Sequence, residues 1–212
     1  IGRELAEYAD DLRDTEIEDN QSALLALVRM EPVERKQAIE EIKQGAIPHI
    51  ARNSGNDEWY TPKKYIDAAL EVLGHIDLDP ASSEIANKIV KAKMFFPKEH
   101  DGLSKTWRGN VWLNPPYASE LIGKFCDKLI YHFNNDDVKE AIVLVNNATE
   151  TNWFNTLISI SSAIVFPASR IKFLDPNGNP GTPLQGQAII YAGKHVKKFL
   201  DTFRSFGWGA TL

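Results

Sequence analysis

The chain has 212 residues, of which 43% are hydrophobic and 25% are charged, and this suits one globular domain with a small appendage. No apolar run is long enough to span a bilayer. The single cysteine, Cys126, excludes an internal disulfide and a thiolate metal cluster, and it fits a reducing, cytoplasmic setting. The net charge of −5 is uneven, because residues 1–58 carry 7 basic and 14 acidic side chains and the rest carry 17 basic and 15 acidic ones. Nucleic acid is therefore not excluded as a partner of the later part.

The first 57 residues predict a helical segment that ends in a linker. Apolar residues between Leu24 and Val28 have the spacing of one helix face, and Pro32 suits the first turn of a following helix. We favour a plain helical hairpin over a helix-turn-helix. The stretch "GAIPHIARNSGND" has no periodicity and indicates a linker. We therefore expect a helical segment over 1–57, open to self-association or partner binding, and a separate domain over 58–212.

Helices and strands alternate through the rest of the chain. In the helix expected over 61–74, Thr61 is the N-cap candidate, Pro62 takes the first helical position and Gly74 ends the helix. Further helices are expected over 82–92, 118–133, 149–160 and 194–203. Strands are expected over 75–79, 93–96, 110–113, 140–147 and 162–166, on both sides of a Pro/Gly-rich loop within 170–192, and over 207–212. The alternation predicts an α/β fold with a mainly parallel sheet and an antiparallel C-terminal hairpin.

The string Asn114-Pro115-Pro116-Tyr117 follows a short apolar strand. Proline cannot donate to a sheet ladder, so the strand must stop here, at the edge where open α/β sheets bind ligands. The Asn114 side chain and the Pro115 carbonyl offer two neighbouring acceptors for both hydrogens of an NH₂ group. Tyr117 could stack on a ring that carries this amine. The alternative is a cis-proline turn in which Tyr117 only packs.

Acidic residues mark two further positions. Asp79 is the last residue of a predicted strand that also contains Asp77, and a carboxylate there could meet the hydroxyl or ammonium groups of a ligand. The alternative is a turn-forming or helix-capping aspartate. Asp101 lies in an Asp-Gly turn and could face the same cleft. No glycine-rich loop follows Asp79, which disfavours a dinucleotide-dependent dehydrogenase.

A third group of candidates flanks the Pro/Gly-rich loop. Arg170 and Lys172 could contact phosphate, although a charge pair on a hairpin is usually solvated. Phe173 could be a core residue or a second stacking ring.

Together these motifs resemble the S-adenosylmethionine-dependent DNA N6-adenine methyltransferases, in particular the phage-encoded Dam family. The similarity covers roughly Trp59 to Trp208. The segments "EWYTP", "IDLDPAS", "DGL…W…NPPY", "VLVNNATETNWF" and "RIKF" stand in the order that this family uses.

The resemblance implies a Rossmann-like sheet of seven strands with S-adenosylmethionine over the carboxyl ends. It implies cofactor contacts at Trp59, Tyr60, Thr61, Pro62, Asp77, Asp79, Pro80, Ala81 and Asp101, a catalytic motif at Asn114, Pro115, Pro116 and Tyr117, and a stacking aromatic at Phe173. The acceptor would be an adenine flipped out of DNA, methylated directly without a metal, in the cytoplasm of a bacterial host if the gene is a phage gene. RNA-base or glutamine-amide methylation, and a catalytically silent DNA-binding module, remain the alternatives.

Overall fold

The computed structural model of the chain describes residues 27, 32–43, 59–117, 119–175, 177–181 and 185–212. The chain divides into two compact units, residues 1–58 and residues 59–212. In the first unit, helix α3 (Pro32–Lys43) begins at the predicted proline. Leu27 and Ile39 are buried, and Arg35 Nε donates a hydrogen bond to the Leu27 carbonyl at 2.9 Å. Leu27 belongs to the predicted first helix and is helical, while the rest of that helix and the linker lie outside the described residues.

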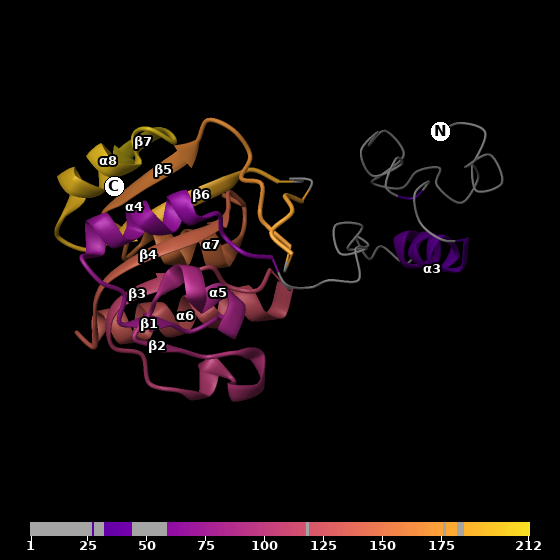
Figure 1. Ribbon diagram of the computed structural model, residues 1–212, viewed down its shortest axis with the longest axis horizontal. Helices are drawn as coiled ribbons and strands as arrows, with labels where there is room; N and C mark the ends of the chain where they lie inside the picture. The colour runs from indigo at the N-terminus through magenta and orange to yellow at the C-terminus, as the bar shows by residue number, and fades with distance from the viewer. Residues whose placement is uncertain (1–26, 28–31, 44–58, 118, 176, 182–184) are drawn as a thin grey trace. The chain divides into compact units, whose positions relative to one another are not determined.

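The second unit alternates helices and strands, as Figure 1 shows. Its helices are α4 (Lys63–Leu73), α5 (Glu84–Val90), α6 (Ser119–Asn134), α7 (Asn152–Ile158) and α8 (Val196–Phe203), with 3-10 turns η3 (Lys98–His100) and η4 (Gly102–Ser104). Its strands are β1 (Leu78–Asp79), β2 (Met94–Phe95), β3 (Gly109–Leu113), β4 (Val138–Asn146), β5 (Ala163–Pro167), β6 (Gln187–Ala192) and β7 (Gly207–Thr211).

These strands form one sheet of seven strands in the order β2-β1-β3-β4-β6-β5-β7. Strands β2, β1, β3 and β4 are parallel, β6 runs antiparallel between β4 and β5, and β7 pairs antiparallel with β5. The mixed sheet confirms the predicted α/β fold with antiparallel strands at the C-terminal end. Because β5 runs in the same direction as β4, the carboxyl ends of β1, β3, β4 and β5 meet at one edge of the sheet.

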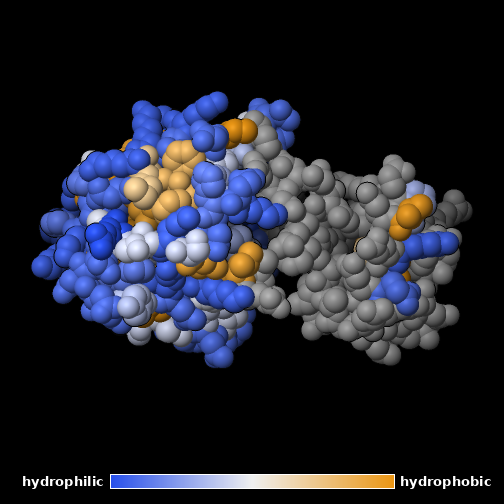
Figure 2. Space-filling view, turned by 90° about the horizontal axis from the view of Figure 1, so that it is seen from below, coloured by the Kyte–Doolittle hydropathy of each residue, from blue (hydrophilic) through white to orange (hydrophobic). Residues whose placement is uncertain are grey.

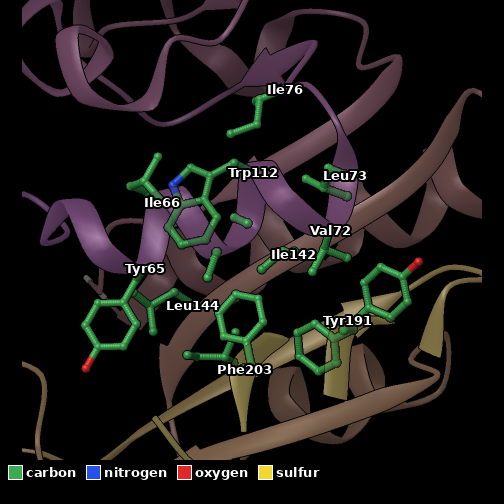
Figure 3. Close-up of a cluster of buried hydrophobic side chains, with 14 of the residues drawn as sticks. Tyr65, Ile66, Val72, Leu73, Ile76, Trp112, Ile142, Leu144, Tyr191 and Phe203 are labelled. Atoms are coloured by element: carbon green, nitrogen blue, oxygen red, sulfur yellow. The ribbon is translucent and has the colours of Figure 1, made fainter. Parts of the chain in front are cut away.

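Helices cover both faces of this sheet. Helices α4, α5 and α8 pack on one face, and α6 and α7 pack on the other. Neighbouring residues of a strand point to opposite faces, so Trp112 joins the first cluster and Leu113 the second. Figure 3 shows side chains of α4, β3, β4 and α8 meeting in the first cluster. Strand β4 is apolar and buried from Ala141 to Val145, where both of its faces are covered.

One predicted strand is wrong. The segment "RIKF" was expected to pair as a strand, but the described residues between β5 and β6 contain only isolated bridges, from Leu174 to Tyr60 and to Pro180. The Ile171 N–H donates to the Gln187 side-chain oxygen at 3.0 Å, so a side chain takes the place of a neighbouring strand.

The surface of this unit is largely hydrophilic in the view of Figure 2, with smaller hydrophobic areas between the charged side chains. Among the helices that the structure describes, none is both long and apolar enough to cross a membrane. Cys126 lies in α6 and is buried in the cluster under α6 and α7, where burial raises the pKa of its thiol to about 12. It is therefore a core residue.

Candidate active site

Asn114 lies directly beyond the carboxyl end of β3, where the two prolines stop the strand. Its Nδ2 donates to Thr61 Oγ1 at 3.3 Å, and its Oδ1 accepts from the Tyr117 hydroxyl at 3.2 Å. The amide is thus held between two hydroxyl groups. No peptide bond among the described residues is cis, so the bonds before Pro115 and Pro116 are trans and the alternative of a cis-proline turn falls away.

The Tyr117 hydroxyl has a choice of two acceptors. It lies 3.2 Å from Asn114 Oδ1 and 3.3 Å from the Leu144 carbonyl of β4, but it has one proton to donate. Burial raises the pKa of Tyr117 well above its usual range, so the hydroxyl stays a donor at neutral pH. The ring is half-buried and packs against the cluster under α6 and α7. The sequence had suggested a stacking ring and gave no sign of this contact with Asn114.

Thr61 does not cap helix α4, which corrects the sequence-based expectation. The helix begins at Lys63, its N-cap residue is Pro62, and no side chain caps it. Thr61 is instead 7% exposed, and its hydroxyl accepts from Asn114, 53 positions further along the chain. Thr61 therefore contacts the residue at the edge of the sheet and does not cap the helix.

Asp79 ends β1, next to β3 in the sheet, and its side chain is buried. Loss of water on burial raises its pKa to about 7, against a smaller lowering by the Ala81 N–H, which donates to Oδ1 at 3.3 Å. The neighbouring Ser82 hydroxyl also lowers this pKa, yet its Oγ is buried without a partner of hydrogen-bond geometry among the described residues. A buried carboxylate beside an unsatisfied hydroxyl fits a ligand that carries hydroxyl or ammonium groups.

Asp77 does not join this group. It precedes β1, and its Oδ2 accepts from the backbone N–H of Asn110 at the start of β3, at 2.8 Å. Its other oxygen pairs with Lys93 at 2.7 Å. Burial alone would raise the pKa of Asp77, but the bonds from Asn110 and Lys93 and the nearby His75 hold it below its usual range. These partners indicate a structural role at the amino end of the sheet.

The Asp101 turn lies against the end of β1. A Cβ added to Gly102 would stand 2.0 Å from the Pro80 carbonyl oxygen, so only glycine allows this approach. Asp101 has a positive φ of 43°, and its Oδ1 accepts from the Leu103 N–H at 3.1 Å. The turn is therefore brought beside Asp79, while one carboxylate oxygen of Asp101 is used within the turn.

The segment around Tyr60 joins two loops at this edge. Tyr60 and Leu174 exchange backbone hydrogen bonds of 2.8 and 2.9 Å, and the Tyr60 hydroxyl accepts from Ser83 Oγ at 3.4 Å. Trp59 packs on the loop after β5, since a Cβ on Gly181 would come within 2.3 Å of its ring. Trp59, Tyr60 and Thr61 thus connect the ends of β1, β3 and β5.

The remaining candidates follow the end of β5. Arg170 and Lys172 are exposed, and Phe173 is half-buried against the cluster under α4 and α8. Gln187, which sequence reasoning missed, anchors this segment through Ile171. Its amide also donates to the Gln185 carbonyl at 2.7 Å. A polar residue at the start of a buried apolar strand was the available signal.

One comparison with known proteins identifies the family of the chain. The family model described as DNA N-6-adenine-methyltransferase (Dam) matches residues 49–190. The matched part includes Thr61, Asp79 and the four residues from Asn114 to Tyr117, and it ends before α8 and β7. No curated protein and no solved structure matches the chain. The chain belongs to the Dam family of DNA N6-adenine methyltransferases, and it is a transferase enzyme.

Proposed function

We propose that this enzyme binds S-adenosylmethionine over the ends of β1 and β3 and methylates the N6 amine of an adenine flipped out of DNA. The observation that carries the proposal is the place of Asn114. Its amide stands just past the end of β3, next to the strand that ends in Asp79, and two hydroxyls hold it. An acceptor amine at Asn114 would therefore lie beside a ligand at Asp79.

Asn114 and Pro115 are proposed to act on the amine. The lone pair of an exocyclic amine is delocalised into the ring and is a poor nucleophile. Two acceptors, Asn114 Oδ1 and the Pro115 carbonyl oxygen, can take one hydrogen each and favour a tetrahedral nitrogen with a localised lone pair. Catalysis would then come from alignment and from fixed dipoles placed before the reaction.

Asp79 and its neighbours are proposed to hold the cofactor. When bound, S-adenosylmethionine supplies an electrophilic methyl group on its sulfonium. Asp79 would accept hydrogen bonds from the ligand's hydroxyl or ammonium groups, and Ser82 Oγ would gain the partner that it lacks in the described residues. Trp59, Tyr60, Pro62, Pro80, Ala81 and Asp101 are proposed to contact the same ligand: the Ala81 N–H donates to Asp79, Tyr60 bonds to Ser83, and the turn of Asp101 lies against Pro80. Thr61 is left out of this group because its hydroxyl contacts Asn114. Asp77 is left out of it because its carboxylate faces the start of β3.

DNA would be held at the same edge of the sheet. A base inside a duplex cannot reach a side chain at the end of β3, so the adenine must leave the stack. Tyr117 is proposed to stack on the flipped ring, with Phe173 as a second aromatic contact. Arg170 and Lys172 are exposed beyond β5 and are proposed to contact phosphates.

The test is to incubate the protein with radiolabelled S-adenosylmethionine and, separately, with DNA, RNA and protein, and then to map the product. Label at N6 of adenine in DNA supports the proposal. Label in RNA or on glutamine amides, with none in DNA, would contradict it. A protein that binds DNA but transfers no methyl group to any of the three would be a silent binding module instead.

A further inference from the structure

We propose that Thr61 is a positioning residue for the reaction, because its hydroxyl helps to hold the Asn114 amide in the arrangement that leaves Oδ1 as an acceptor. The inference deepens the proposed function and rests on it. The Thr-Pro pair was expected to contact the cofactor, whereas in the structure the Thr61 hydroxyl accepts a hydrogen bond from the amide of Asn114.

The Thr61 hydroxyl is available for this role. It is not used to cap α4, whose N-cap residue is Pro62 and which has no side-chain cap. The residue is 7% exposed, so water competes little for its hydroxyl. The backbone around it is also held in place, since the preceding Tyr60 is paired with Leu174 through two hydrogen bonds. A fixed acceptor at 3.3 Å from Asn114 Nδ2 is the result.

The direction of the amide matters for the chemistry. An acceptor amine brings hydrogens, so it needs the oxygen of Asn114 and not its NH₂ group. An amide turned by 180° about its last bond would place N–H against N–H and repel the amine. In the structure Nδ2 is the atom bonded to Thr61 and Oδ1 is the acceptor atom of the amide, and Thr61 helps to hold the amide in this arrangement.

The Tyr117 hydroxyl differs from that of Thr61, because it can move its hydrogen bond from Asn114 to another acceptor. In the structure its hydroxyl donates to Asn114 Oδ1, and the Leu144 carbonyl lies only 3.3 Å away. When an amine donates to Oδ1, the Tyr117 proton can turn to Leu144, and no buried donor is left without an acceptor. The Tyr117 hydroxyl therefore holds the amide before the acceptor arrives, while Thr61 holds it throughout.

The experiment compares Thr61→Val with Thr61→Ser in the full chain. Valine keeps the shape and removes the hydroxyl, whereas serine keeps the hydroxyl. We expect Thr61→Val to lower kcat about tenfold, the loss that follows from one buried hydrogen bond, with the affinity for S-adenosylmethionine unchanged by calorimetry. Thr61→Ser should recover kcat relative to Thr61→Val. A kcat for Thr61→Val equal to that of the parent would overturn the inference.

A second readout separates positioning from cofactor binding and from folding. In the Asn114→Ala background, Thr61→Val should cause no further loss of rate, since the group that it positions is gone. A further tenfold loss there, or a weaker cofactor affinity with an unchanged kcat at saturation, would overturn the positioning role. If Thr61→Val does not fold, Thr61→Ala takes its place in the same comparisons. A parent protein that methylates no adenine would instead refute the proposed function itself.

Discussion

Asp77 and Asp79 flank Leu78 in the chain, yet their pKa values are shifted in opposite directions. Burial raises the pKa of Asp79 to about 7, and hydrogen bonds and nearby cations hold the pKa of Asp77 below its usual range. The Asp77 carboxylate accepts a hydrogen bond from the backbone N–H of Asn110 and forms an ion pair with the Lys93 ammonium group. The Asp79 carboxyl accepts a hydrogen bond from the Ala81 N–H, and the neighbouring Ser82 Oγ has no hydrogen-bond partner in the part of the chain that the structure describes. The two carboxylates therefore lead to opposite predictions.

We predict that Asp79→Asn stabilises the free protein above pH 7 while weakening cofactor binding. The folded pKa lies above the unfolded value of 3.8, so the folded state binds more protons and the free energy of unfolding falls as pH rises from about 4 to about 7. Asparagine removes this loss, which is at most roughly 4 kcal/mol. Urea unfolding at pH 5 and pH 8, with calorimetry of cofactor binding, measures both effects. An Asp79→Asn variant that is less stable than the parent at pH 8 would show that the buried carboxylate is already compensated.

For Asp77→Ala we predict the opposite result, a less stable protein whose cofactor affinity is unchanged. This change leaves the Asn110 N–H without its acceptor and removes the pairing with Lys93, so it should lower the free energy of unfolding by about 1–3 kcal/mol. Cofactor affinity should not change. Calorimetry on the two single variants makes the comparison, and a loss of cofactor affinity in Asp77→Ala as large as in Asp79→Asn would restore Asp77 to the cofactor site.

Two substitutions at Tyr117, to phenylalanine and to alanine, should separate the role of its hydroxyl from that of its ring. Tyr117→Phe removes the hydrogen bond that Tyr117 donates to Asn114 but leaves the bond that Asn114 donates to Thr61. We expect a loss of kcat of tenfold at most, or about 1.4 kcal/mol. Tyr117→Ala also removes base stacking, worth roughly 1–3 kcal/mol. The fluorescence of 2-aminopurine at the target position, which rises on unstacking, reports flipping separately. Equal rates in the two variants would argue against stacking.

Residues 1–57 are proposed to be a separate segment, and their removal should leave a folded core that binds the cofactor. All seven strands and both core clusters of the sheet lie within residues 59–212. Circular dichroism and calorimetry on the shortened protein test this. An insoluble product, or one that does not bind cofactor, would mean that the N-terminal residues complete the fold.

The position of Asn114 could be predicted from the sequence because two physical rules act locally. Proline ends a strand, and parallel strands in an α/β fold place their carboxyl ends at one edge. The long apolar run of β4 likewise predicted a strand covered on both faces, and the structure covers both.

The contacts that refine the site could not be predicted, because they depend on packing between distant segments. The bond from Asn114 to Thr61 joins residues 53 positions apart, and a Thr-Pro pair before a helix is equally typical of a cap. The roles of Asp77 and Asp79 depend on where β1 begins, which is at Leu78. The segment "RIKF" has strand-like residues, but the Gln187 side chain satisfies its backbone at Ile171.

The most direct measurement of the central claim is the rate of methyl transfer to adenine N6 by Asn114→Ala, beside its affinity for S-adenosylmethionine. Asn114 is proposed to act on the acceptor amine and not on the cofactor. Losing one fixed polar contact of this kind typically lowers kcat by about 10²–10³. We predict a loss of this size with cofactor affinity nearly intact. Methylation of DNA by Asn114→Ala at the rate of the parent would contradict the account, and the prolines after β3 would then form only a turn.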